Sequence, residues 1–150
     1  VWQAMIYTPL TRLAMQIAYK AHNGQTDKAG LPYIYHPIHV AEQMDDEASI
    51  CVALLHDVAE DTDIGLDEIA AYGFGEDVIS ALRLLTRDRS VPYMDYIKRL
   101  SHNKTAAKVK RADLMHNSDL TRLEEINEKA RKRAEKYKQA LKILKGSDSY

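Results

Sequence analysis

Apolar residues recur at helical spacing through nearly the whole chain. They stand three or four positions apart, and no segment alternates at period two for long enough to predict a sheet. Capping signals divide the pattern, because Thr8 precedes a proline, Asp46 and Asn103 precede apolar series, and Gly73 follows one. The expected helices span about 9–22, 37–44, 46–55, 66–72, 76–85, 92–100, 104–117 and 128–144. The chain is therefore predicted to be all-α.

Two of these segments differ from ordinary amphipathic helices. The segment 46–55, which contains the single cysteine Cys51, is apolar almost all the way round and is expected to be a buried central helix. The segment 128–144 is rich in Lys, Arg and Glu and carries one narrow apolar stripe. We expect the stripe to cover the core, rather than a partner chain, and the basic residues to form a solvated face.

Composition excludes several classes of function. A chain of 150 residues with 45% apolar and 29% charged residues is typical of one globular domain, here 1–150. The net charge of -1 gives no overall attraction for nucleic acid, and no apolar run approaches the roughly 20 residues that span a bilayer. We expect a cytoplasmic protein with no nucleic-acid or membrane partner, and a homo-oligomer is compatible with the sequence.

Ionisable side chains interrupt the apolar pattern at four places. In chain order these are His36, His56–Asp57, Glu60–Asp61 and Asp113, with Asn117 four residues further on. We expect the buried helix to run on through this region, so that residues four apart, such as His56 and Glu60, share one side of it. Carboxylates so close together could not all stay ionised without a cation. The pattern therefore predicts a divalent-metal site.

The expected metal ligands are His36, His56, Asp57 and Asp113. Two imidazole nitrogens and two carboxylate oxygens suit Mn²⁺, with Fe²⁺ as an alternative, better than a structural Zn²⁺. Glu60 and Asp61 would orient a metal-activated water and carry its proton. The competing interpretation treats the histidines as structural and the acidic run as a helix end. Unpaired charges at the end of a buried helix would be costly, which favours the metal.

The order of these groups resembles the HD superfamily of metal-dependent phosphohydrolases. Three blocks, 22–41, 54–62 and 112–117, are similar to the hydrolase domain of the stringent-response alarmone enzymes. The resemblance covers about 10–123, and the charged helix at about 128–144 lies beyond it. It implies a compact HD-type helical bundle that acts alone, without the synthetase domain of that family.

The resemblance also implies an activity. It implies hydrolysis of guanosine 3′,5′-bis(diphosphate) (ppGpp), or of its pentaphosphate form pppGpp, to GDP or GTP and pyrophosphate, with Mn²⁺ as cofactor. Glu60 and Asp61 would be the catalytic acidic pair, and Lys28 and Asn117 would contact the nucleotide.

Several charged positions bear on the substrate. Asp27 stands where the family commonly has an arginine that frames the base, and Leu114 stands where an arginine often follows the metal ligand. Neither change touches the metal chemistry, but both remove a cation from substrate recognition. Lys108 is expected on the Asp113 side of its helix as a substrate contact, and Lys110 on the surface.

Two alternative functions follow from these departures. The first is an HD phosphohydrolase that acts on another nucleotide or small phosphate ester. The second is a non-catalytic module that binds a metal or a nucleotide. The presence of both Glu60 and Asp61 argues against the second, because a structural metal site would not need them.

Overall fold

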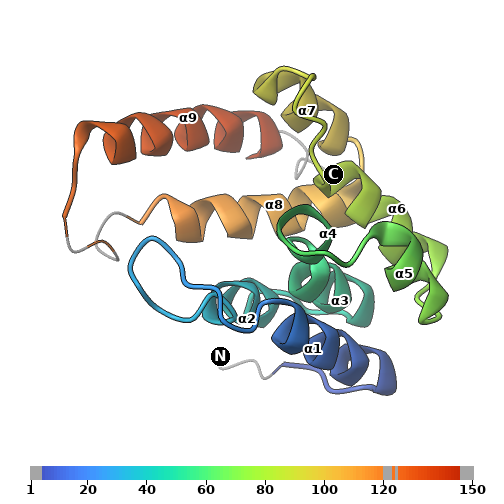
Figure 1. Cartoon of the computed structure of the whole chain (residues 1–150). Helices are drawn as coiled ribbons and strands as arrows, with labels where there is room; N and C mark the ends of the chain where they lie inside the picture. The colour runs from blue at the N-terminus through green and yellow to red at the C-terminus, as the bar shows by residue number, and fades with distance from the viewer. Residues whose placement is uncertain (1–4, 120–122, 124, 146–150) are drawn as a thin grey trace.

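The described residues of the chain are almost entirely helical. The computed structural model describes residues 5–119, 123 and 125–145 (Figure 1). The helices are α1 (Pro9–Ala21), α2 (Tyr35–Glu42), α3 (Glu47–Leu55), α4 (Val58–Asp61), α5 (Leu66–Ala71), α6 (Glu76–Leu85), α7 (Tyr93–Leu100), α8 (Lys104–Asn117) and α9 (Glu128–Lys145). Within this part of the chain, β-pairing is limited to an isolated bridge between Thr26 and Pro32. The predicted all-α class is confirmed.

The helix ends follow the capping signals in the sequence. The side chains of Thr8, Asp46 and Asn103 each accept a hydrogen bond from the backbone N–H three residues later, which satisfies a donor that the first turn leaves open. After α5, Gly73 adopts a φ of 100°, a left-handed conformation that favours glycine. These four predicted caps are confirmed.

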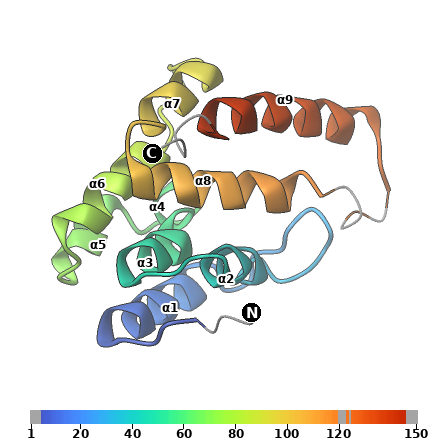
Figure 2. The same cartoon turned by 180° about the vertical axis from the view of Figure 1, so that it is seen from behind.

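Helix α3 forms the centre of the core. Its residues from Ser49 to Leu55, including Cys51, are all buried, as its apolar circumference predicts. It packs against α1, α2, α6 and α8. Figures 1 and 2 show α8 between the layer of α2 and α3 and the long helix α9. The long helix buries Ala130, Ala134, Ala140 and Leu144, so its apolar stripe covers the core as expected.

Two helix boundaries differ from prediction. Helix α2 was expected to begin at Pro37, but it begins at Tyr35. Pro37 then lies in the first turn, where a helix needs no backbone N–H. The buried helix was expected to run on through the acidic segment, and this is wrong: α3 ends at Leu55, and α4 begins at Val58 after a turn formed by His56 and Asp57. The site depends on that break.

No described helix is long and apolar enough to cross a membrane. The single-domain boundaries, the cytoplasmic location and the homo-oligomer stay predictions.

Candidate active site

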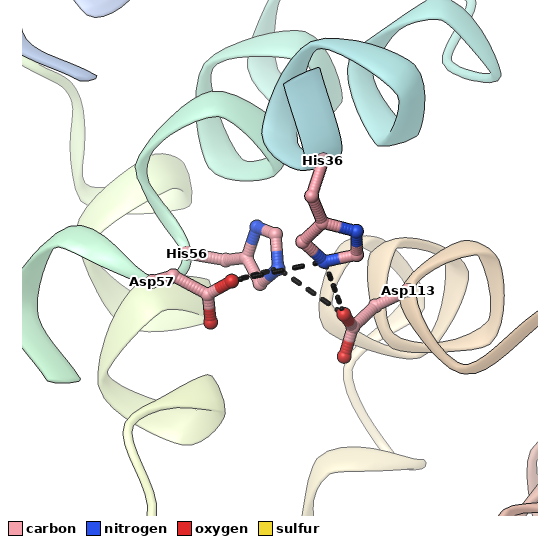
Figure 3. Close-up of side chains that lie close together, drawn as sticks. All are labelled: His36, His56, Asp57 and Asp113. Atoms are coloured by element: carbon pink, nitrogen blue, oxygen red, sulfur yellow. Dashed lines mark hydrogen bonds and ion pairs between the residues drawn. The ribbon is translucent and has the colours of Figure 1, made fainter. Parts of the chain in front are cut away.

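Three elements bring four buried metal-binding groups to one point. Helix α2 supplies His36, the turn between α3 and α4 supplies His56 and Asp57, and α8 supplies Asp113 (Figure 3). One ligand atom from each lies within 4.8 Å of the others. His36 Nε2 is 2.7 Å from Asp113 Oδ1, and His56 Nε2 is 3.1 Å from Asp57 Oδ2. The structure therefore brings together all four residues that the sequence proposed as ligands.

The backbone break before α4 sets the orientation of His56. Its Nδ1 lies 2.5 Å from the carbonyl oxygen of Ala53, the group that a continuing helix would offer to the N–H of Asp57. A carbonyl only accepts, so Nδ1 carries a proton and Nε2 is the nitrogen that faces the cluster. The other imidazole is also held from behind, because His36 Nδ1 lies 2.7 Å from His116 Nδ1.

The cluster fits a divalent cation. His56 Nε2 is buried within 3.5 Å of both carboxylates, yet it has no hydrogen-bond partner among the described residues. Burial opposes charge on His56, but the carboxylates of Asp57 and Asp113 outweigh it and hold its pKa well above the ordinary value. Burial likewise opposes ionisation of both carboxylates, but Lys110 and the imidazoles keep the pKa of Asp113 low and His56 does so for Asp57. A bound divalent cation would displace the proton that the carboxylates hold on His56 and would supply the positive charge that both ionised carboxylates favour.

Neighbouring side chains hold the two carboxylates in place. The hydroxyl of Tyr33 donates to Asp57 Oδ2 at 2.6 Å, and burial and the Asp57 charge raise the pKa of Tyr33, so the donor keeps its proton. The amide of Asn117 donates to Asp113 Oδ1 at 3.0 Å. Asn117, which was predicted to contact the nucleotide, thus also orients a metal-binding carboxylate.

The acidic pair lies on α4 beside the cluster. Glu60 Oε1 accepts a hydrogen bond from the backbone N–H of Arg87 at 3.1 Å, and the side-chain amide of Gln25 donates to the backbone carbonyl of Asp61 at 2.9 Å. Partial burial, together with the charge of Asp57, raises the pKa of both Glu60 and Asp61. A raised pKa makes each carboxylate a better proton acceptor near neutral pH.

Two adjoining cavities lie beside the cluster, and the smaller one reaches it at Asp113. The larger, about 540 Å³, is lined by Lys28 and Tyr33 from the segment between α1 and α2 and by Arg133 from α9. The smaller, about 180 Å³, is lined by Glu60, Asp113 and cations. Asp61, Arg89, Asn117 and Tyr137 line both. Lys28 and Asn117 therefore both line the larger cavity, and their contact with a nucleotide stays a prediction.

The two lysines of α8 exchange their expected places. Lys108 forms an ion pair with Asp45, away from the metal-binding cluster, so its predicted position beside Asp113 is wrong. Lys110, expected on the surface, places Nζ 3.0 Å from Asp113 Oδ2 with a side chain only 14% exposed. Lys110 stands three positions before Asp113 and shares its helix face, whereas Lys108 stands five positions before it and four before Ala112. The ring of Tyr96 on α7 packs against Lys110.

The two departures from the family pattern have structural uses. Asp27 Oδ1 accepts hydrogen bonds from the backbone N–H groups of Ala29 and Leu31, which closes the turn that ends at Gly30 with a φ of 83°. Leu114 is 1% exposed and belongs to the core.

Sequence reasoning missed the contribution of α9 to this cleft. Arg133, Lys136 and Tyr137 line the cavities, although the basic face of this helix was expected to be solvated. The apolar stripe could have indicated this contribution. Tyr137 stands at the edge of the stripe, so the neighbouring cations Arg133 and Lys136 must lie close to the part of the fold that the stripe covers.

Comparison with known proteins agrees with this geometry. Residues 14–145 match the HD domain family. Human guanosine-3′,5′-bis(diphosphate) 3′-pyrophosphohydrolase MESH1 is 34% identical over 147 residues, which cover 89% of this chain and 82% of the human protein. The guanosine-3′,5′-bis(diphosphate) 3′-pyrophosphohydrolase of Borreliella burgdorferi is 34% identical over 120 residues, 69% of this chain and 18% of that protein.

A solved structure is similar over almost the whole fold. It is reported as a metazoan ortholog of SpoT that hydrolyzes ppGpp and plays a role in starvation responses, and it superposes with a TM-score of 0.77 at 27% identity, covering 96% of this chain and 90% of that one. The chain belongs to the HD domain family and, within it, to the family of guanosine-3′,5′-bis(diphosphate) 3′-pyrophosphohydrolases that includes MESH1.

Proposed function

We propose that this protein hydrolyses guanosine 3′,5′-bis(diphosphate), or its pentaphosphate form, and releases pyrophosphate from the 3′ position with Mn²⁺ as cofactor. The observation that carries the proposal is a buried cluster of two histidines and two aspartates that opens directly into a cleft with cations on several sides. The named activity of the relatives supports the substrate. The donor set of mixed nitrogen and carboxylate ligands supports Mn²⁺, with Fe²⁺ as the alternative.

In this proposal each part of the site has one task. His36, His56, Asp57 and Asp113 would hold the ion, which when bound acidifies water and polarises a phosphoryl oxygen. Lys28 and Asn117 bind the nucleotide along the larger cavity. The cations of the cleft offset the negative charge of the substrate.

Glu60 and Asp61 then manage the proton. Water attacks the phosphorus next to the ribose, the bond from that phosphorus to O3′ breaks, and pyrophosphate and a 3′-hydroxyl are the products. Asp61 lines both cavities and is placed to accept the proton of the water, while the Arg87 N–H holds Glu60 in position. The raised pKa of both carboxylates favours their taking up this proton and passing it to O3′.

Pyrophosphate release from ppGpp tests the proposal directly. With Mn²⁺, the wild-type protein should release pyrophosphate and GDP, and a chelator should abolish the reaction. Glu60→Gln and Asp61→Asn should each lower kcat by about 10² or more while metal content is retained. Turnover of another nucleotide, with none of ppGpp, would support the broader HD phosphohydrolase. Metal bound without turnover of any phosphate ester would support a binding module.

A further inference from the structure

The smaller cavity contains two cations that the hydrolytic step does not use. Arg87 comes from the segment between α6 and α7, and Lys136 comes from α9. The guanidinium carbon of Arg87 lies 5.1 Å from the centre of the Tyr93 ring, and Lys136 Nζ lies 4.6 Å from the same centre. Two segments far apart in the sequence thus direct like charges at one aromatic side chain.

Acids do not neutralise this pair of cations. Among the described residues, no ion pair joins Arg87 or Lys136 to a carboxylate. Of the three acids that line the cavity, Glu60 accepts from the backbone of Arg87 and Asp113 is paired with Lys110, and Asp61 forms no ion pair with either cation. Burial, and then repulsion from Arg87, lowers the pKa of Lys136. An uncompensated cluster of this kind favours an anion.

Two buried donors in the same place also lack an acceptor. Arg87 Nε and the hydroxyl oxygen of Tyr93 are inaccessible to solvent and have no hydrogen-bond partner in the described part of the chain. Burial raises the pKa of Tyr93 to about 12, so the hydroxyl keeps its proton and can donate. Buried donors are costly to leave unpaired, and a bound ligand with several oxygens would satisfy them.

The position of the cavity identifies which part of a substrate it would hold. It touches the metal-binding cluster at Asp113 and joins the larger cavity along Asp61, Asn117 and Tyr137. A phosphoryl group at the metal ligands therefore has room for a nucleoside on one side and for a small anion on the other. In a diphosphate ester, that small anion is the distal phosphate.

We propose that Arg87, Lys136 and the Tyr93 hydroxyl form a subsite for the distal phosphate of a diphosphate group and make the enzyme select diphosphate over monophosphate esters. The substrate assignment rests on the proposed function. When the bond to O3′ breaks, the distal phosphate stays in this subsite as part of the leaving pyrophosphate. Pyrophosphate itself should therefore bind the protein, and inorganic phosphate should bind much more weakly.

Calorimetric titration of the metal-loaded protein with pyrophosphate and with inorganic phosphate tests the subsite without turnover. Wild type should bind pyrophosphate at least about ten-fold more tightly than phosphate, since each charge-assisted hydrogen bond contributes about one order of magnitude. Lys136→Met and Arg87→Met should each lose about ten-fold for pyrophosphate and little for phosphate, with metal content unchanged. Arg87→Met keeps the backbone N–H that Glu60 uses.

Lys138→Met is the matched control. Lys138 is exposed on the same helix and, two positions from Lys136, points about 200° away around it. It removes the same charge and should leave both affinities as in wild type. Equal affinity of wild type for the two anions, or a loss in Lys136→Met no greater than in Lys138→Met, would overturn the subsite. Lys136 lies at the surface, so Lys136→Met should fold. If Arg87→Met folds poorly, Lys136→Met alone tests the subsite.

Turnover separates this proposal from the proposed function. The ratio of kcat/KM for a guanosine 3′-diphosphate over a guanosine 3′-monophosphate should fall about ten-fold in Lys136→Met. If wild type does not hydrolyse ppGpp but its selectivity for pyrophosphate depends on Lys136, the proposed function fails and the subsite stands. If ppGpp is hydrolysed and the ratio is the same in Lys136→Met and wild type, the subsite is wrong and the proposed function stands.

Discussion

Lys110 pairs with Asp113, the carboxylate that we propose as a metal ligand, so replacing this lysine should affect the metal-free protein most. Lys110 Nζ lies 3.0 Å from Asp113 Oδ2, and the side chains are 14% and 6% exposed. The imidazoles of His36 and His56 approach the other oxygen, Oδ1. Without metal, Lys110 is the closest full positive charge to Asp113. With metal, a divalent cation compensates the same carboxylate from the Oδ1 side.

The size of the effect follows from the burial of this pair. Removing one partner from a buried ion pair costs about 3–5 kcal/mol, and the partial exposure of Lys110 places Lys110→Met near 3 kcal/mol. In a domain of this size, 1 kcal/mol corresponds to about 2–4 °C in Tm, so the metal-free variant should melt about 6–12 °C below wild type. With the cation in place, only the lost hydrogen bond of about 1 kcal/mol remains, or about 2–4 °C.

Calorimetric melting of both proteins, once with chelator and once with excess Mn²⁺, measures this difference. Lys110→Arg keeps the charge and serves as the control, with a metal-free Tm close to that of wild type. The metal should therefore raise the Tm of Lys110→Met by more than it raises that of wild type. An equal loss of Tm with and without metal would refute the reasoning and would make Lys110 a packing residue of the α7–α8 contact.

Three further substitutions probe the rest of the site. Asp113→Asn should lower the metal content measured by elemental analysis and reduce the gain in Tm on adding metal, and unchanged content would contradict its assignment as a ligand. Glu60→Gln should melt higher than wild type in the metal-free state at pH 7. Folding raises the pKa of Glu60, so the wild-type protein loses stability as the pH rises above the ordinary pKa of a glutamate and this side chain ionises in the folded state. The neutral glutamine avoids this loss, so the gain in Tm should shrink toward pH 4. A gain independent of pH would contradict this sign. Tyr33→Phe should weaken metal binding by about ten-fold in a competition titration, and unaltered affinity would show that the hydroxyl does not orient Asp57.

The helices and the four candidate metal ligands could be identified in the sequence because their signals are local. A cap such as Thr8 or Asn103 acts on a backbone group three residues away, and the periodicity of α3 directly reports burial on all sides. The ligands were visible as ionisable groups placed where the apolar pattern demands burial, at His36, His56–Asp57 and Asp113. Their convergence follows once α2, α3 and α8 pack around the same centre.

The break before α4 could not be predicted, because no glycine or proline marks it. The helix ends where the His56 ring, rather than the next backbone N–H, takes the carbonyl of Ala53. The lysine that faces Asp113 could have been identified from spacing, because Lys110 stands three positions before Asp113 and Lys108 stands five. The burial of Lys110 under the ring of Tyr96, and the pairing of Lys108 with Asp45, could not, because they depend on tertiary neighbours.

Metal chemistry and substrate selection come from different parts of this fold. The ligands lie on buried positions of α2, α8 and the α3–α4 turn, where any substitution also disturbs the core. Apart from Asn117 on α8, the groups proposed to select the substrate lie on the segment between α1 and α2, around the start of α7 and on α9. The apolar stripe of α9 anchors that helix at Ala130 and Ala134, while Arg133 and Lys136 face the cleft. Changes at these two cations should therefore alter which phosphate ester is accepted while leaving metal affinity and Tm close to wild type. A variant of Arg133 or Lys136 that lost metal would show that α9 supports the metal centre itself.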